Sequence, residues 1–210
     1  MNLINYYWYF KSAIPERICD DIVRYGHQLQ DQMAITGGYG QGKNLSKKQT
    51  KDLKKRRDSD VVWMSDRWIY KEIQPYIHMA NQSAGWNFEW DYSEPCQFTR
   101  YKKGQFYDWH FDSWDQPYQK ENPQDPSHGK IRKLSVTVTL SDPKDYKGGE
   151  LEFDFRNLDP DKKRNTYKCT EILPKGSLVV FPSFVWHRIC PVKSGERNSL
   201  VIWNLGHSFK

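Results

Sequence analysis

The run KLSVTVTL, residues 133–140, alternates apolar and polar side chains with a period of two, which is typical of a β-strand. Short runs with this strand-like pattern recur from Trp86 to the end of the chain, and Gly, Pro, Asp and Lys separate most of them. So many short strands predict a mainly β fold with a double-stranded β-helix (jelly-roll) core or a barrel. The runs are NFEWDY, CQFTRY, QFYDWHFD, KLSVTVTL, GELEFDF, TYKCTEIL, GSLVVF, WHRICPV and NSLVIWNL.

Two helices are expected before these strands. Residues 14–30 carry apolar side chains at helical spacing. Residues 65–80 carry three isoleucines four residues apart, although Pro75 within this run predicts a kink or an early end. We therefore expect the chain to form a single domain, in which residues 1–85 supply helical support and residues 86–210 form the jelly-roll core.

Two polar segments are expected to be loops. The first covers residues 36–59 and includes KNLSKKQTKDLKKRR (43–57). This stretch contains eight Lys or Arg and one acid, so its own net charge exceeds the net charge of +6 of the whole chain. This basic segment is either a lid that closes over a substrate or a solvated loop, and the sequence leaves both open. The second, SWDQPYQKENPQDPSHG (113–129), is too polar and proline-rich for a core and predicts a surface loop.

The cysteines and the hydropathy pattern bear on the cellular compartment. The four cysteines lie far apart without the spacing of metal ligands, which predicts free thiols in a reducing compartment. The first residues lack the pattern of a signal peptide, and no apolar run approaches the length of a membrane span. We expect a cytoplasmic protein without a membrane partner, in a host cytoplasm if a phage encodes it.

Three residues have the chemistry of a metal site. His110 and Asp112 lie two residues apart, so on a strand both side chains would point to the same face. His187, at the start of another strand-like run, could add a third ligand. Two histidines and one carboxylate on one face of a metal are typical of non-haem Fe(II) oxygenases, because the opposite positions stay open for cosubstrate and oxygen. An H-x-D pair in isolation is more often a surface or salt-bridged pair.

Arg197 extends this constellation. It lies two residues before the start of the apolar run SLVIWNL, and a buried arginine there would be costly without an anionic partner. Its planar fork matches a carboxylate in a bidentate way, as a chelating cosubstrate with a second carboxylate would require. The alternative is an exposed strand end at which Arg197 pairs with Glu196 or solvent, and the spacing alone leaves both open.

Three stretches of the chain together resemble the prolyl 4-hydroxylase-like family of Fe(II)- and 2-oxoglutarate-dependent dioxygenases, most closely its small bacterial or phage members. The resemblance covers about residues 57–206, and the order, spacing and flanking residues of the motifs all fit. It implies a jelly-roll fold with Fe(II) as cofactor, 2-oxoglutarate and O2 as cosubstrates, and ascorbate as a possible reductant. The stretches are RYKKGQFYDWHFD (100–112), GGELEF (148–153) and PKGSLVVFPSFVWHRICPVKSGERNSLVIW (174–203).

The resemblance also implies roles for individual residues. His110, Asp112 and His187 match the iron ligands. Arg197 matches the basic residue that binds the distal carboxylate of 2-oxoglutarate, and Tyr101 matches a tyrosine that hydrogen-bonds the cosubstrate.

Four further positions are expected to line the cosubstrate pocket. Thr139 stands where the oxygen-sensing branch of the family has a tyrosine, and this departure puts one contact in doubt. Thr137 lies one pleat earlier on the same face, and Ser199 lies two residues after the arginine, a spacing typical of a second carboxylate contact. Trp203 matches a tryptophan beside the metal.

The implied reaction is oxidative decarboxylation of 2-oxoglutarate to succinate and CO2, coupled to hydroxylation of a substrate C–H bond. The leading expectation is prolyl hydroxylation of a peptide or protein, acidic or proline-containing. Arg57, which lies in the segment KRRDSDVVWM, and Arg132 are candidate substrate contacts, and Trp114 in the proline-rich loop is another.

Two alternatives remain. A related oxygenase could act on another residue, an amino acid or a nucleic acid, but nucleic-acid demethylases typically carry a second arginine where this chain has Trp203. A jelly-roll module without catalysis, or with Zn(II) as a structural ion, would be expected to have lost at least one of the ligands or the arginine.

Overall fold

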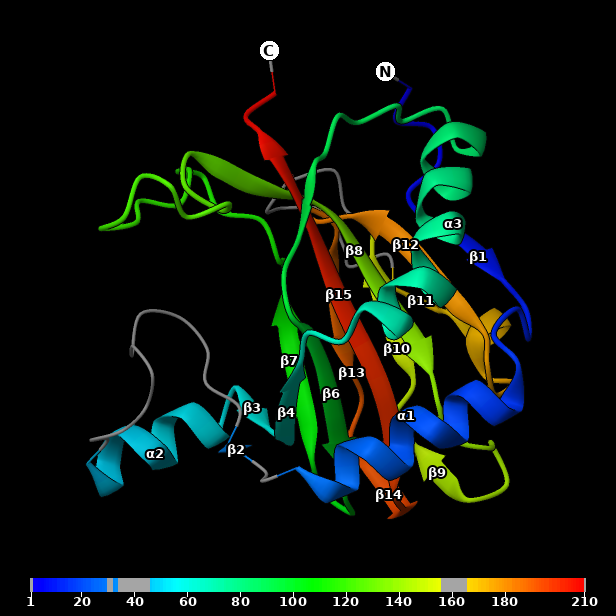
Figure 1. Cartoon of the computed structure of the whole chain (residues 1–210). Coiled ribbons are helices and arrows are strands. Elements are labelled where there is room, and N and C mark those ends of the chain that lie inside the picture. The colour runs from blue at the N-terminus through cyan, green and yellow to red at the C-terminus, as the bar shows by residue number, and fades with distance from the viewer. Residues whose placement is uncertain (1, 30–31, 34–45, 156–165, 210) are drawn as a thin grey trace.

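Two antiparallel sheets make up most of the computed structural model, which describes residues 2–29, 32–33, 46–155 and 166–209 (Figure 1). The larger sheet has the strand order β1 (Trp8–Phe10), β12 (Leu178–Pro182), β8 (Lys130–Thr139), β15 (Arg197–His207), β6 (Cys96–Tyr101), β4 (Asp60–Met64) and β2 (Gln32–Met33). A short strand, β5 (Tyr92–Ser93), also pairs with β15. The smaller sheet has the order β11 (Thr166–Lys168), β10 (Leu151–Asp154), β13 (Trp186–Ile189), β7 (Phe106–His110) and β3 (Arg57–Asp58). A separate antiparallel pair joins β9 (Tyr146–Gly148) to β14 (Val192–Gly195), which lie far apart in the sequence.

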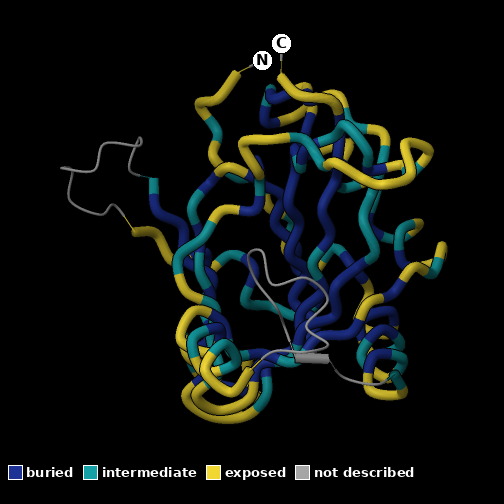
Figure 2. The backbone as a smooth tube through the Cα atoms, turned by 90° about the vertical axis from the view of Figure 1, so that its left-hand side faces the viewer, coloured by how far each residue is buried: buried dark blue, intermediate teal, exposed yellow. Residues whose placement is uncertain are grey.

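Helices cover one face of the larger sheet. α1 (Glu16–Gln28) and α3 (Arg67–Ser83) pack against it through one hydrophobic cluster, which includes Val136 and Val138 of β8. At Gly26 the helix α1 approaches β6 so closely that a Cβ would lie 2.6 Å from ring carbons of Phe98. Figure 2 shows the strands as a buried centre and the connecting segments as the exposed periphery. The mainly β, double-sheet architecture is the one predicted from the sequence.

The other face of the larger sheet turns toward the smaller sheet. Phe181 and Val179 of β12 share a second hydrophobic cluster with Phe153 and Ile189 of the smaller sheet. Ser135, Thr137 and Thr139 of KLSVTVTL also lie on this side and are buried, so both faces of β8 are inside the protein. Buried polar groups need hydrogen-bond partners, and Ser135 and Thr137 are part of the site described below.

One helical prediction needs correction, and one of two alternatives in another is ruled out. Of the kink or early end expected at Pro75, the early end does not occur: α3 continues to Ser83, and Pro75 is on the exposed side of the helix, where water can satisfy the carbonyl of the preceding turn. Within the predicted loop 36–59, residues 36–45 lie outside the described residues, but α2 (Lys47–Lys54) is a helix. A capping box explains it, because the Ser46 hydroxyl accepts from the Gln49 backbone N–H and the Gln49 side chain accepts from the Ser46 N–H.

Two predicted strands also differ. In NFEWDY only Tyr92 joins a strand, because the backbone of Phe88 hydrogen-bonds the side-chain amide of Asn81 at both its N–H and its C=O. The run TYKCTEIL divides into β11 and a short 3-10 helix, η1 (Thr170–Ile172). Residues 1–85 contribute strands β1 to β4 as well as helices, while 113–129 form neither helix nor strand and are largely exposed, as predicted.

The four cysteines are free thiols, as predicted. Among the described residues, no helix combines the length and the apolar character needed to cross a membrane.

Candidate active site

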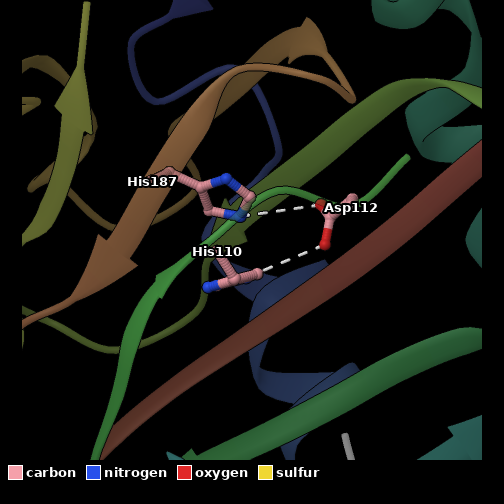
Figure 3. Close-up of side chains that lie close together, drawn as sticks. All are labelled: His110, Asp112 and His187. Carbon is pink, nitrogen blue, oxygen red and sulfur yellow. Dashed lines mark ion pairs between the residues drawn. The ribbon is translucent and has the colours of Figure 1, made fainter. Parts of the chain in front are cut away.

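The smaller sheet brings the two distant histidines together. His110 is the last residue of β7, and its register partner across the strands is His187 of β13. Asp112 lies just beyond the end of β7, where its N–H donates to the Ser183 carbonyl in a turn rather than continuing the strand. The ligand atoms of the three residues all lie within 4.8 Å of one another (Figure 3).

Backbone carbonyls orient both imidazoles. His110 Nδ1 lies 2.7 Å from the Asp108 carbonyl oxygen, and His187 Nδ1 lies 3.0 Å from that of Val185. Since a carbonyl can only accept, each Nδ1 carries the proton and each Nε2 keeps its lone pair. The two Nε2 atoms lie 3.7 and 3.6 Å from the two carboxylate oxygens of Asp112. This arrangement aims three donor atoms at one point, as a metal centre requires.

Burial and charge hold the site in the protonation states that bind a metal. Burial, helped by the neighbouring His187, holds the pKa of His110 well below its usual range, so this imidazole is neutral. Burial alone would raise the pKa of Asp112, but His187, His110, Arg132 and a hydroxyl of Ser135 together lower it to about 2. A neutral imidazole and an ionised carboxylate need lose no proton when a cation binds.

Ser135 is a residue that the sequence analysis missed. Its hydroxyl donates to Asp112 Oδ2 at 2.7 Å and lies 2.9 Å from the Ser183 hydroxyl, and Ser135 is fully buried on β8. The hydroxyl therefore fixes the orientation of the carboxylate. The alternation of KLSVTVTL places Ser135 on the same face as Thr137, so the sequence pattern could have identified Ser135 as a residue of the site.

A narrow cavity adjoins the triad. Its walls include four of the residues predicted to bind the cosubstrate, namely Tyr101, Thr137, Ser199 and Trp203. Trp203 Nε1 is buried and has no hydrogen-bond acceptor among the described residues, so a ligand oxygen in the cavity could satisfy it. Thr139, the remaining predicted residue, is buried on β8 opposite Ser199.

Arg197 lies beside two residues that line this cavity, Tyr101 and Ser199. It is only 2% exposed, pairs in register with Tyr101, and donates from Nη1 to the Ser199 hydroxyl at 3.1 Å. Within the described part of the chain, no carboxylate forms an ion pair with it, while the neighbouring Glu196 faces His27 instead. The exposed alternative considered for Arg197 is therefore not what the structure shows. Gly149 makes room for it, because a Cβ there would lie 2.9 Å from Arg197 Cδ.

The three predicted substrate contacts differ in position. Arg57 lines the cavity, donates from Nη2 to Gln97 Oε1 at 2.6 Å, and lies over the Tyr107 ring at 4.5 Å. Arg132 covers the Trp203 ring at 3.9 Å, and the structure brings it to the same region. Trp114 is 48% exposed on the loop 113–129 and does not line the cavity.

One partner of these residues, Glu94, was not found from the sequence, whereas Tyr107 was expected to pack around the ligand strand. Glu94 accepts hydrogen bonds from Arg132 Nε at 2.9 Å and from Nη2 at 2.5 Å, which fixes the guanidinium above Trp203. The Tyr107 ring stacks on His110 with ring centres 3.5 Å apart. No sequence pattern marks Glu94, since its partner is 38 residues away in the chain.

The fold and the triad together define a jelly-roll protein with a site for a non-haem metal. Two imidazoles and one carboxylate fit Fe(II), and all three residues also line the cavity that lies next to the buried Arg197. The profile of the 2OG-Fe(II) oxygenase superfamily matches residues 96–204, and the chain belongs to this superfamily. Membership implies Fe(II), 2-oxoglutarate and O2 as cofactor and cosubstrates.

Relatives with similar sequences carry the name PKHD-type hydroxylase. The relative from Shewanella sp. strain ANA-3 is 35% identical over 111 residues, which cover 52% of this chain and 42% of the relative. The relative from Xanthomonas euvesicatoria is 33% identical over 110 residues, with the same coverage. The chain thus spans less than half the length of these curated relatives.

Solved structures show the same fold over nearly the whole chain. The viral collagen prolyl hydroxylase of Paramecium bursaria Chlorella virus-1, in complex with 2-oxoglutarate, has a TM-score of 0.62 at 22% identity, covering 97% of both chains. A Pseudomonas putida prolyl-4-hydroxylase has a TM-score of 0.64 at 19% identity, covering 96% of this chain and 93% of its own. A Trichoplax adhaerens prolyl hydroxylase, in complex with a peptide fragment, has a TM-score of 0.65 at 15% identity, covering 96% and 84%. The chain therefore has the fold of the prolyl 4-hydroxylases.

Proposed function

We propose that the chain is an Fe(II)- and 2-oxoglutarate-dependent dioxygenase that hydroxylates a prolyl residue of a peptide or protein, with succinate and CO2 as coproducts. The observation that carries the proposal is the buried Arg197, which has no carboxylate partner in the described chain and lies in the same interior as a complete His–Asp–His triad. A cation buried without a counter-ion is costly, and the distal carboxylate of 2-oxoglutarate would supply that counter-ion.

Each part of the site has a role in this proposal. His110, Asp112 and His187 would hold Fe(II), which when bound supplies the oxidative chemistry. Arg197 would bind the distal carboxylate through its planar fork, while Ser199, which already accepts from Arg197, would offer its hydroxyl as a second contact.

The remaining walls of the cavity position the ligands and exclude water. The Tyr101 hydroxyl is proposed to donate to the cosubstrate, and Trp203 Nε1 is a free donor on the same wall. Leu151 and Ile189 add apolar surface that keeps water from the reacting atoms. Arg57 and Arg132 are proposed as contacts for the substrate main chain, whose carbonyl groups accept hydrogen bonds.

The prolyl peptide substrate is supported by similarity of fold. The three similar structures described above are prolyl hydroxylases, and one of them contains a peptide fragment. Arg132 is already neutralised by Glu94, so the region around Trp203 is less cationic than its arginine suggests, which favours a polypeptide over a polyanion.

Succinate formation from 2-oxoglutarate by the Fe(II)-loaded protein tests the proposal, first alone and then with a panel of proline-containing peptides. We expect peptide-stimulated succinate formation and a peptide that gains one oxygen atom on proline. His110→Ala should abolish both activities. Succinate formation that no prolyl peptide stimulates would reassign the substrate, and a complete lack of turnover would indicate a jelly-roll binding module.

A further inference from the structure

The positive charge of the chain is concentrated in one segment next to the site. Residues 46–58 contain seven Lys or Arg and two acids, a net charge of +5 out of +6 for the whole chain. We call α2 and its C-terminal continuation to Arg56 the basic helix. Its six exposed cations are Lys47, Lys48, Lys51, Lys54, Lys55 and Arg56.

These charges are unfavourable for the helix itself. The first turn contains two lysines and no acid, although the N-terminus of a helix favours negative charge. Lys51 lies four residues from both Lys47 and Lys55, a spacing at which like charges repel. Among the described residues, ion pairs neutralise only Lys54 and Lys55, which lie 3.4 Å from Asp58 and 2.9 Å from Asp52. An anionic partner would relieve this repulsion.

The basic helix is nevertheless held in a defined place. The capping box fixes its start, and Leu53 anchors its inner face with only 3% of its surface exposed. The chain then enters β3, whose Arg57 pairs in register with Tyr107 of β7. The Asp108 N–H also donates to the Arg56 carbonyl at 2.8 Å. The exposed lysines are therefore linked rigidly to the strand that ends at His110, and Figure 1 shows α2 beside β3 and β4.

We propose that the basic helix binds an acidic segment of the polypeptide substrate, adjacent to the residue that enters the active site. This inference rests on the proposed function. The helix of eight residues is about 12 Å long, which matches three or four residues of an extended peptide. Asp and Glu side chains on such a segment would complement the three unpaired lysines at its start.

A peptide fits this surface better than a nucleic acid does. Proteins that bind single strands combine cations with aromatic side chains on which bases stack. Residues 46–58 contain no aromatic residue. The helix itself is also short, about 12 Å, which is less than several nucleotides of an extended strand would need.

Binding of labelled peptides to the full chain, in the presence of 2-oxoglutarate and Mn(II), tests the inference by fluorescence anisotropy. The probes are a proline-containing peptide flanked by several Asp and Glu residues and a counterpart in which Asn and Gln replace them. The test variant is Lys47→Glu/Lys48→Glu/Lys51→Glu, whose new acids in the first turns favour the helix and so preserve the fold. The matched control, Lys144→Glu/Lys147→Glu/Lys193→Glu, makes the same charge change on exposed lysines near β9 and β14.

We expect the wild type to prefer the acidic peptide, and the helix variant to bind it at least about tenfold more weakly at low salt. The control variant should stay within about twofold of the wild type. Equal binding of both peptides, or equal losses in both variants, would overturn the inference. Single-stranded DNA that displaces the acidic peptide at much lower concentration would also overturn it, in favour of a nucleic acid.

The proposed function is judged separately, by 2-oxoglutarate turnover of the wild type in the presence of Fe(II). A wild type that binds the acidic peptide through the basic helix but consumes no 2-oxoglutarate would refute the dioxygenase and leave the docking surface standing.

Discussion

Replacing Ser135 by alanine removes the hydroxyl group that donates to Asp112 Oδ2 at 2.7 Å. Because Ser135 is fully buried, water cannot take the place of that hydroxyl, and the carboxylate loses the contact that fixes its orientation. A hydrogen bond to a charged group contributes about 1.5–3 kcal/mol, and loss of such an outer partner typically weakens metal binding by about 10- to 100-fold. We therefore expect Ser135→Ala to bind Fe(II), or Co(II) in its place, about 10- to 100-fold more weakly.

Metal titration of the apo protein under anaerobic conditions measures this effect directly. The matched control is Ser177→Ala, which also removes a fully buried serine hydroxyl, the one that accepts from the Ser12 N–H at 2.9 Å. Both variants should lose a similar free energy of unfolding, about 1–2 kcal/mol, but only Ser135→Ala should lose metal affinity. Unchanged affinity in Ser135→Ala, or equal losses in both variants, would refute a positioning role for Ser135.

Three further outcomes are expected from urea unfolding of the apo protein. Glu94→Gln should lower the free energy of unfolding by about 2 kcal/mol, because it leaves Arg132 uncompensated in a mostly buried place, and a smaller loss in Arg132→Met/Glu94→Gln would identify the pair as the cause. Gly26→Ala should lower the free energy of unfolding by about 1–3 kcal/mol, because it forces a Cβ against the Phe98 ring. The same substitution should lower it less in a protein that also carries Phe98→Leu, and additive losses of the two substitutions would contradict the contact. The pKa of Asp112 is lowered from 3.8 to about 2, so its ionised form stabilises the fold above about pH 4 and loses this effect toward pH 2. The loss in free energy of unfolding caused by Asp112→Asn should therefore become smaller as the pH falls from about 5 to about 3. A loss that does not change with pH would contradict the lowered pKa.

The alternation of apolar and polar residues predicted the sheets because side-chain direction in a strand follows directly from chain position. It also indicated which residues share a face, so that Thr137 could be assigned to the pocket beside the triad. Alternation does not distinguish solvent from a buried polar cavity, however. Both faces of β8 are buried, and the polar face that contains Ser135 contributes to the wall of the site.

Two of the errors in secondary structure came from side-chain hydrogen bonds to the backbone. Asn81 bonds both backbone groups of Phe88 and so removes them from strand pairing. Ser46 and Gln49 cap a helix in a lysine-rich segment that was expected to be a loop. Each case depends on one or two residues, which outweigh the average preference of the segment.

Contacts between distant segments were the hardest to predict. His110 and His187 could be paired because the chemistry of a metal site requires a third ligand. Glu94 could not be paired with Arg132, since any of the many carboxylates in the chain could neutralise an arginine. Only the pairing of the strands in the folded protein determines which carboxylate lies beside Arg132.

The most direct test of the account is an anaerobic visible absorption spectrum of the apo protein on addition of Fe(II) and then 2-oxoglutarate. We expect a new metal-to-ligand charge-transfer band that is absent in His110→Ala and needs far more 2-oxoglutarate in Arg197→Ala, because His110 is proposed to bind the metal and Arg197 the distal carboxylate. A protein that binds Fe(II) but develops no such band with 2-oxoglutarate would contradict the assignment of the cavity as the cosubstrate pocket.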